Sequence, residues 1–303
     1  MPGLAAQGQQ EGAVPTQVLV GIDAKSAPPD NASVLTVAVN NHKEPLSSWA
    51  PVEPGNAQVA LLIDEGLRES VGREMGNLRA FVGSLAPGVE VLVGYMDHGS
   101  VVQAQSFTSD HALAASTLHL PEGVPGASAS PYLCLSDFVK RWPDSSNAAS
   151  SSDPVQSSRH KARFVLLLSN GVDPYNGGTS VMNQDSPYVQ TAVSDAQRAG
   201  VAVYSIYFGD AGIRGGRADF SGQGYLSEVA QGTGGVNYYE GTGNPVSMLP
   251  YLKMFQGAIA ETYIATFDAP VGKDPQRDMV HLKLTAPKVK LRAPEEVRPG
   301  NRE

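Results

Sequence analysis

The residues best placed for chemistry follow an apolar run that predicts a buried strand. Residues 58–64 read QVALLID, and the chain then passes through Gly66 and Arg68 into a helical pattern. A strand that ends in a carboxylate and leads into a helix lies where an open α/β sheet binds its ligands. The carboxylate of Asp64 is therefore the first candidate for a metal or ligand site.

The residues after Asp64 argue against a bound divalent cation. A hard cation needs several oxygen ligands, yet the alternate positions hold Gly66, which has no side chain, and Arg68, which is itself a cation. The pattern predicts the scaffold of a metal site without its metal ligands. Arg68 either replaces the ion by pairing with Asp64 or points to solvent, where ion pairs contribute little.

Further carboxylates lie in two glycine-rich loops. Asp173 and Asp185 bracket one loop, and Asp210 and Asp219 lie in the other, at 209–224. These side chains could line a ligand face, but Asp also forms turns and caps helices for local reasons. Tyrosine supplies contact area at low entropic cost, and aromatic residues occur in and near both loops: Tyr175, Tyr188, Phe220, Tyr225, Tyr238 and Tyr239.

The remaining residues offer little for catalysis. The histidines lack the i, i+4 spacing of a helical zinc pair, and no Gly-x-Ser-x-Gly turn is present. Residues 232–235, Gly-Thr-Gly-Gly, follow a helical pattern and precede a strand, which favours a helix end over a phosphate loop. Cys134 lies in the apolar run 132–135, which predicts a buried, unreactive thiol.

Composition excludes two classes of partner. The chain of 303 residues has a net charge of −8, whereas nucleic-acid binding needs clustered Lys and Arg. No apolar run is long enough to span a bilayer. Leu4-Ala5-Ala6 resembles the end of an export signal whose front is missing, and no charged region followed by an apolar region precedes it, so the sequence leaves the compartment open.

The pattern of elements predicts the organisation of the chain. Residues 1–14 read as a disordered lead, 15–52 as an N-terminal β segment, and 50–55 as a proline-rich linker. Residues 57–262 alternate strands with helices, and 144–158 form a serine-rich surface loop. Residues 263–297 return to a β pattern, and we expect them to pack with the N-terminal segment.

The fold class follows from this order. We expect an α/β fold with a Rossmann-like, doubly wound, mostly parallel sheet, flanked by a small antiparallel β layer. Strands are predicted at 16–24, 33–39, 58–64, 89–96, 101–107, 162–169, 201–208, 263–268, 279–285 and 289–292. Helices are predicted at 67–85, 110–117, 131–139, 187–199, 224–230 and 246–262.

Between residues 57 and 262 the sequence resembles the von Willebrand factor type A (VWFA) domains, above all the VWFA-related proteins of bacteria. The resemblance is carried by QVALLIDEG (58–66), RFVLLLSNGVDPYNGG (163–178), VAVYSIYFGD (201–210) and LSEVAQGTGGVNYYEG (226–241). It implies a VWA fold that binds another macromolecule, often through a metal-ion-dependent adhesion site at the carboxyl ends of the strands.

Most of that adhesion site is replaced in this chain. The family motif Asp-x-Ser-x-Ser falls on Asp64, Gly66 and Arg68, its threonine falls near Ser130, and its second aspartate falls on Asn170. Two hydroxyl ligands and one negative charge are lost, so the resemblance implies a degenerate site with no metal and no cofactor. Asp173 lies on the rim of the same site.

The sequence therefore predicts a non-enzymatic protein-protein interaction or adhesion module that acts without a metal. Its partner would be a protein or a cell-envelope component. The resemblance implies a protein exported from a bacterial cell, periplasmic or extracellular, with a signal peptide that is not present in this chain. One alternative is an enzyme or small-molecule-binding protein that uses the crevice at the carboxyl ends of the strands, with Asp64 or Asp173 as general base. Another is a structural part of a larger assembly, which would present an exposed β edge.

Overall fold

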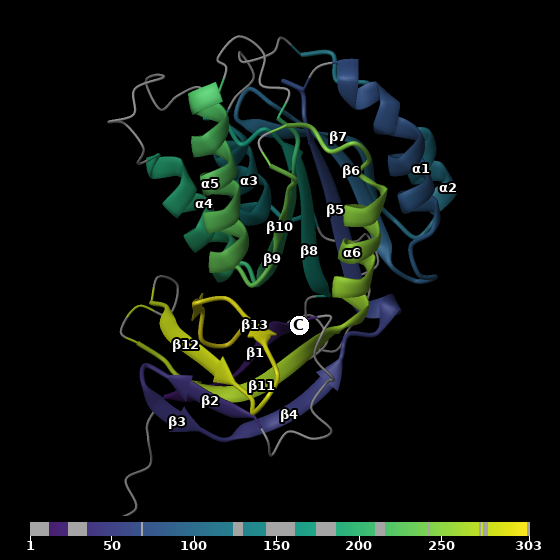
Figure 1. The fold of residues 1–303 in the computed structure, drawn as a ribbon. Coiled ribbons are helices and arrows are strands. Elements are labelled where there is room, and N and C mark those ends of the chain that lie inside the picture. The colour runs from purple at the N-terminus through teal and green to yellow at the C-terminus, as the bar shows by residue number, and fades with distance from the viewer. Residues whose placement is uncertain are drawn as a thin grey trace, which may run out of the picture.

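The structure, a computed structural model, contains a central sheet covered by helices on both faces (Figure 1). It describes residues 12–23, 35–67, 69–123, 130–143, 161–173, 186–209, 216–241, 243–272, 274 and 278–301. Most of the predicted lead and the serine-rich segment 144–158 lie outside these ranges. No helix within them is long and apolar enough to cross a membrane.

Within the described ranges the central sheet has six strands in the order β10-β9-β8-β5-β6-β7. All neighbouring pairs are parallel except β6 and β7, which are antiparallel. This confirms the predicted mixed α/β class with a mostly parallel sheet. The strands are β5 (Ala57–Asp64), β6 (Glu90–Asp97), β7 (Ser100–Thr108), β8 (Ala162–Ser169), β9 (Val201–Tyr207) and β10 (Asn237–Tyr238).

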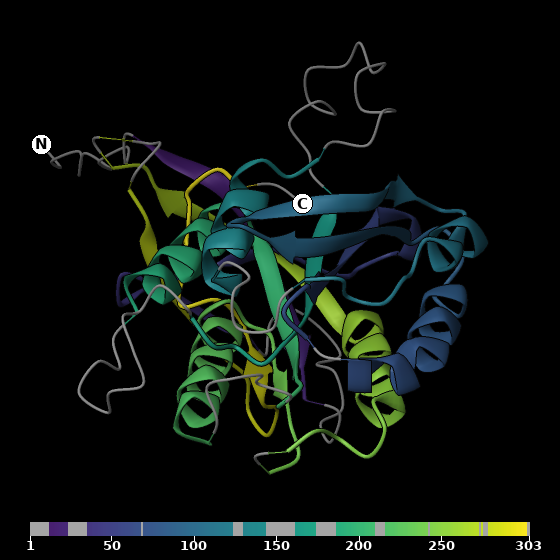
Figure 2. The same cartoon turned by 90° about the horizontal axis from the view of Figure 1, so that it is seen from above.

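The central strands are apolar throughout because both of their faces are covered. Leu61 and Ile63 of β5 face one core, whereas Ala60 and Leu62 face the other. Helices α1 (Met75–Gly83), α2 (His111–Ser116) and α6 (Leu249–Ala260) cover the first face. Helices α3 (Pro131–Lys140), α4 (Pro187–Arg198) and α5 (Gly216–Gly232) cover the second, as Figures 1 and 2 show.

The two ends of the chain form antiparallel sheets beside the α/β unit, below it in Figure 1. One sheet has the order β13-β1-β11-β4 and the other β14-β12-β2-β3. Both contribute to one core, in which Val20 and Phe267 of the first sheet meet Val37 and Leu282 of the second. The strands are β1 (Ala13–Ile22), β2 (Thr36–Val39), β3 (His42–Glu44), β4 (Leu46–Pro51), β11 (Thr262–Pro270), β12 (Val280–Thr285), β13 (Leu291–Arg292) and β14 (Glu296–Val297).

Several predicted boundaries differ from the observed ones. Ala13 and Val14 fall in the predicted lead, but they pair with Pro270 and Ala269 of β11 and so begin β1. Strands β3 and β4 are not predicted, because their mostly exposed residues show no apolar alternation. Strand β4 also runs to Pro51, into the segment predicted as a linker.

The helix predicted at 67–85 is the largest local difference. The chain instead forms a 3-10 helix, η3 (Glu69–Glu74), and only then the α-helix α1. Gly72 and Gly76 flank the change, and glycine disfavours a continuous α-helix. The apolar positions Leu67, Val71 and Met75 are nevertheless buried, so the periodicity predicted the inward face correctly.

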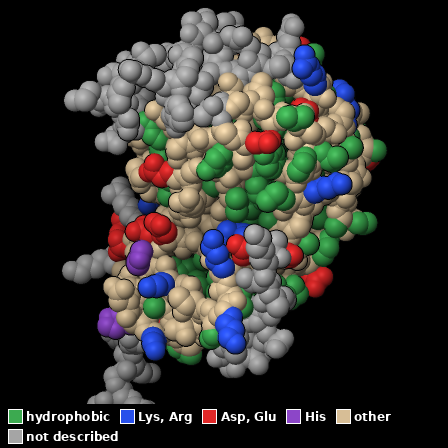
Figure 3. Space-filling model, viewed as in Figure 1, with side chains coloured by type: hydrophobic (Ala, Val, Ile, Leu, Met, Phe, Trp, Pro, Cys, Tyr) green, Lys and Arg blue, Asp and Glu red, His purple; other side chains and the backbone are tan. Residues whose placement is uncertain are grey.

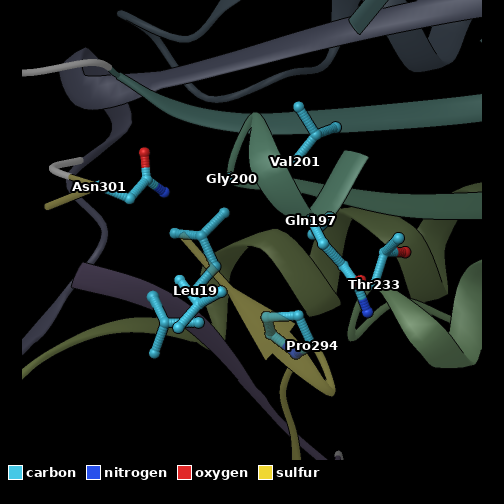
Figure 4. A pocket seen from close by; sticks show the side chains of 10 residues that line it. Leu19, Gln197, Gly200, Val201, Thr233, Pro294 and Asn301 are labelled. Atoms are coloured by element: carbon cyan, nitrogen blue, oxygen red, sulfur yellow. The ribbon is translucent and has the colours of Figure 1, made fainter. Parts of the chain in front are cut away.

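The β layer packs closely under the α/β unit. Leu19, Gln197, Thr233 and Pro294 line a cavity of about 10 Å³ between the two parts (Figure 4). A cavity of that size holds about one water molecule at most. The C-terminal segment is fixed here, since the backbone N–H of Gln17 donates to the carbonyl of Asn301 at 2.7 Å.

Candidate functional site

Asp64 and Ser169 end the two neighbouring strands β5 and β8. The strand that follows β5 along the chain, β6, lies toward one edge of the sheet. The strand that follows β8, β9, lies toward the opposite edge. Ligands of doubly wound sheets bind at the carboxyl ends of strands where the direction of winding reverses in this way. We call this region, the strand ends with residues 64–67 and 169–173, the crest.

The carboxylate of Asp64 connects the two turns of the crest. It is buried, with 3% of its surface exposed. Its Oδ1 accepts a hydrogen bond from the backbone N–H of Gly66 at 2.8 Å, and its Oδ2 accepts one from the hydroxyl of Ser169 at 2.7 Å. The Ser169 hydroxyl in turn accepts from the backbone N–H of Gly171 at 2.9 Å. The aspartate thus holds both turns in place.

Tyr132 of α3 connects the second face of the sheet to the crest. Its hydroxyl donates to the carbonyl of Gly171 at 2.6 Å. Burial raises the pKa of Tyr132 well above its ordinary value, and the negative charges of Asp173 and Asp64 raise it further. The hydroxyl therefore stays protonated and remains a donor. Its ring also contacts Tyr225 of α5 edge to face, with centroids 5.8 Å apart.

Two glycines bring α5 directly against the crest. Gly171 has a φ of +67°, and a Cβ there would lie 2.3 Å from the carbonyl oxygen of Gly222. A Cβ on Gly222 would lie 2.2 Å from the carbonyl oxygen of Asn170. The backbones of the β8 turn and α5 are therefore in close contact, and neither position has room for a side chain.

The other predicted site residues make hydrogen bonds within their own loops or to the start of a neighbouring helix. The hydroxyl of Ser130 accepts from the backbone N–H of Leu133 and caps α3. The side-chain oxygen of Asn170 accepts from the N–H of Val172 at 2.9 Å. Asp173 accepts a hydrogen bond from the hydroxyl of Ser186, the residue before α4. Ser130 therefore caps a helix and Asn170 shapes its own turn, whereas Asp173 contacts the residue before α4 through its side chain.

The structure brings only some of the predicted residues together. The backbone N–H of Gly66 donates a hydrogen bond to Asp64. The negative charges of Asp64 and Asp173 both raise the pKa of Tyr132. Arg68 lies outside the described residues, so its pairing with Asp64 stays a prediction. The same holds for Tyr175, Asp185 and Asp210, and for the side chains of Asp219 and Phe220.

Sequence reasoning missed three residues that build the crest. Ser169 is the last residue of the predicted strand 162–169, and a parallel strand beside β5 must end next to Asp64, so its position was available from the sequence. Tyr132 gives no such signal, because it lies in an apolar helical run. Glu65 accepts hydrogen bonds from the backbone N–H groups of Glu122 and Gly123 at 2.6 and 2.9 Å, and so holds residues 122–123 beside the crest.

The thiol of Cys134 is buried, as the sequence predicts. Burial raises its pKa to about 12, with a smaller contribution from the negative charge of Asp64. Among the described residues, no three His, Cys, Asp or Glu side chains come together as a possible metal cluster.

A second surface feature lies on helix α6 and the segment that precedes it. Val246, Leu249 and Met254 are 93%, 39% and 55% exposed. Figure 3 shows hydrophobic side chains gathered on this side of the molecule, over α6. Contiguous exposed apolar groups are typical of surfaces that contact other proteins.

Comparison with known proteins gives distant structural likenesses. No family model and no curated protein matches the sequence. Among solved structures, the chain is similar to proximal thread matrix protein 1 of the mussel byssus, with 13% identity over 74% of this chain and 50% of that protein, and a TM-score of 0.42. It is also similar to the human COPII-coat protein Sec24c, with 10% identity over 82% of this chain and 44% of the other, and a TM-score of 0.42.

A third similar structure is VWA2, the ArnB paralog of Sulfolobus acidocaldarius. The identity is 11% over 94% of this chain and 76% of that protein, with a TM-score of 0.38. The chain spans about half the length, or less, of the first two proteins. VWA domains are therefore among the structures that this chain is similar to.

Proposed function

We propose that the chain is a metal-independent protein-interaction module of the VWFA type, which binds its partner through the loops at the crest. The observation that carries the proposal is the hydrogen bonding of Asp64. Both of its carboxylate oxygens accept from donors inside the crest, Gly66 N–H and Ser169 hydroxyl. In the family this carboxylate binds the ion, whereas in this chain it holds two turns together.

The neighbouring positions support the same function. Gly66 offers no side-chain oxygen, and the side-chain oxygen of Asn170 is engaged by its own loop. A divalent cation needs about six oxygen ligands, and these two positions supply few oxygens for it. The exposed apolar side chains near α6 favour a protein as the partner. On the resemblance, the partner is a protein or envelope component met outside a bacterial cytoplasm.

A quantitative capture experiment tests the proposal. Immobilised wild-type protein is exposed to the envelope and secreted fractions of the source organism, with magnesium or with EDTA. The matched variants are Asn170→Ala at the crest and Asn56→Ala, which lies before β5 at the opposite end of the sheet. We expect one partner to be retained equally with magnesium and EDTA, lost with Asn170→Ala and kept with Asn56→Ala.

Two outcomes would contradict the proposal. Loss of the partner in EDTA would show that binding needs a metal. Turnover of a small molecule that is abolished by Asp173→Asn, in a variant of unchanged melting temperature, would favour the enzyme alternative.

A further inference from the structure

A second candidate site lies at the end of the α/β unit opposite the crest. A cavity of about 370 Å³ opens there between the last turns of α3 and α4, the start of β8 and the C-terminal segment. Its charged lining residues are Lys140, Arg163, Arg198, Arg298 and Asp195. In Figure 1 this is the lower end of α3 and α4, beside the β layer.

The charge of this cavity is opposite to that of the whole chain. Four cations face one carboxylate in its lining, a formal surplus of three positive charges, whereas the chain carries a net charge of −8. Like charges gathered in a concave site raise the local concentration of ions of the opposite sign. The cavity is therefore suited to an anion.

Arg163 is held rigidly at the base of the cavity. It is 7% exposed, and its Nη1 donates to the carbonyl of Ala199 at 3.2 Å. The guanidinium carbon lies 5.3 Å from the ring centroid of Trp142, within the range of a cation–π contact. Trp142 is itself fixed, because its Nε1 donates to Gln58 at 2.8 Å. This cation is positioned before any ligand arrives.

Asp195 neutralises only part of the surplus. Its Oδ2 accepts from the hydroxyl of Ser136 at 2.6 Å, and Lys140 and Arg198 lie at the longer distances of 3.4 and 3.5 Å. The Nε of Arg198 is buried and has no hydrogen-bond acceptor among the described residues. The guanidinium of Arg198, a residue that lines the cavity, therefore has one donor that the described residues do not satisfy.

Local helix electrostatics account for only part of this arrangement. Lys140 and Arg198 lie in the last turns of α3 and α4, where cations complement the helix dipole. Arg163 comes from a strand, and Arg298 comes from the segment after β14. Their convergence on one cavity is not explained by the two helix ends.

We propose that this cavity binds a small organic oxyanion with two or more negative charges, carried by phosphate or carboxylate groups. Guanidinium groups recognise both through paired N–H donors, and the volume lies within the range of about 300–1,000 Å³ found for small-molecule sites. The ligand contacts both the α/β unit and the C-terminal segment, so its binding stabilises the folded chain. This site lies at the other end of the α/β unit from the crest, so it does not rest on the function proposed for the crest.

Calorimetry and thermal unfolding of the full chain test the site with two probes, pyrophosphate and citrate, at constant ionic strength set with sodium chloride. We expect one of them to bind with a stoichiometry of one and to raise the melting temperature to a plateau. The two probes distinguish a phosphate ligand from a carboxylate ligand. Arg198→Gln and Arg298→Gln should each weaken binding at least about tenfold, the equivalent of about 1.4 kcal/mol.

Arg141→Gln is the matched control. Arg141 follows Lys140, is paired with Asp137 and does not line the cavity, so this variant should bind like the wild type. Absence of saturable binding of both probes would overturn the proposal, and so would equal affinity in the wild type and Arg298→Gln. Arg298 lies outside any helix or strand, so that variant decides the matter even if Arg198→Gln does not fold.

Discussion

The hydroxyl of Ser169 donates a 2.7 Å hydrogen bond to the carboxylate of Asp64 across the ends of two parallel strands. The same oxygen of Ser169 accepts from the N–H of Gly171. One serine therefore links the turn after β5 to the turn after β8. We conclude that the crest is held together by an internal polar network.

Removing the Ser169 hydroxyl should destabilise the fold. In Ser169→Ala, both Asp64 Oδ2 and the Gly171 N–H lose a buried hydrogen bond. Such losses reduce the free energy of unfolding by about 1–3 kcal/mol. Urea denaturation measures the change, and Ser116→Ala on the exposed end of α2 should alter it by less than about 0.5 kcal/mol. Equal stability of the two variants would mean that the Ser169 bond does not hold the crest.

Adding a methyl group at Gly171 should be more disruptive than adding one elsewhere. Gly171→Ala places a Cβ 2.3 Å from the carbonyl oxygen of Gly222, at a positive φ. Overpacking of this kind reduces stability by about 1–3 kcal/mol. Gly76→Ala, in α1 with open space around it, should be neutral or stabilising by up to about 1 kcal/mol. Melting temperatures compare the two, and a Gly171→Ala protein as stable as wild type would contradict the close contact.

The lone cysteine should be unreactive in the folded protein. Burial raises the pKa of Cys134 to about 12, so the thiolate that attacks disulfide reagents is scarce at about pH 8. We expect Ellman's reagent to label one thiol per chain in urea and almost none under native conditions. Rapid, complete labelling of the folded chain would show that α3 leaves its place on the sheet.

The fold should lose stability at alkaline pH. Burial raises the pKa of Tyr95 from 10.0 to about 12, and that of Cys134 from 9.0 to about 12. Both groups stay protonated in the folded chain at a pH where the unfolded chain has released their protons. Their contribution is therefore complete below about pH 9 and is lost as the pH rises toward 12.

Urea denaturation between about pH 8 and pH 11 measures this loss. The free energy of unfolding should fall as the pH rises above about 9, and Tyr95→Phe should make the fall shallower above about pH 10. Ser116→Ala, which changes no titrating group, serves as the control and should show the wild-type slope. A free energy of unfolding that rises across this range would contradict the assignment of buried protonated groups.

The central strands could be predicted from the sequence because burial on both faces leaves an unmistakable pattern. Residues 162–169 are a continuous apolar run, and β8 has the same bounds. Strands β3 and β4 have mostly exposed residues, so local pattern says little about them. Strand β4 also pairs with the distant strand β11, whereas β3 pairs with the adjacent strand β2. The pairing of β1 with β11 joins residues about 250 positions apart, which only the folded chain determines.

The candidate site was predictable where a motif fixes a position and not where packing does. Asp64 follows from the strand that precedes it, and its place at the switch point follows from the fold class. The contact of Gly171 with Gly222, and the reach of Tyr132 into the crest, depend on how α3 and α5 sit on the sheet. The spacing of residues along the chain does not show how these helices pack on the sheet.

Titration with manganese tests the central claim most directly, because the claim is that Asp64 holds the crest together instead of holding an ion. Calorimetry on the wild type and Asp64→Asn, from micromolar to millimolar metal, should show no saturable binding to either protein. Arg68→Ser, which removes the cation and restores one hydroxyl, shows whether the wild-type result depends on that arginine. One manganese ion bound per wild-type chain, and lost in Asp64→Asn, would contradict the account.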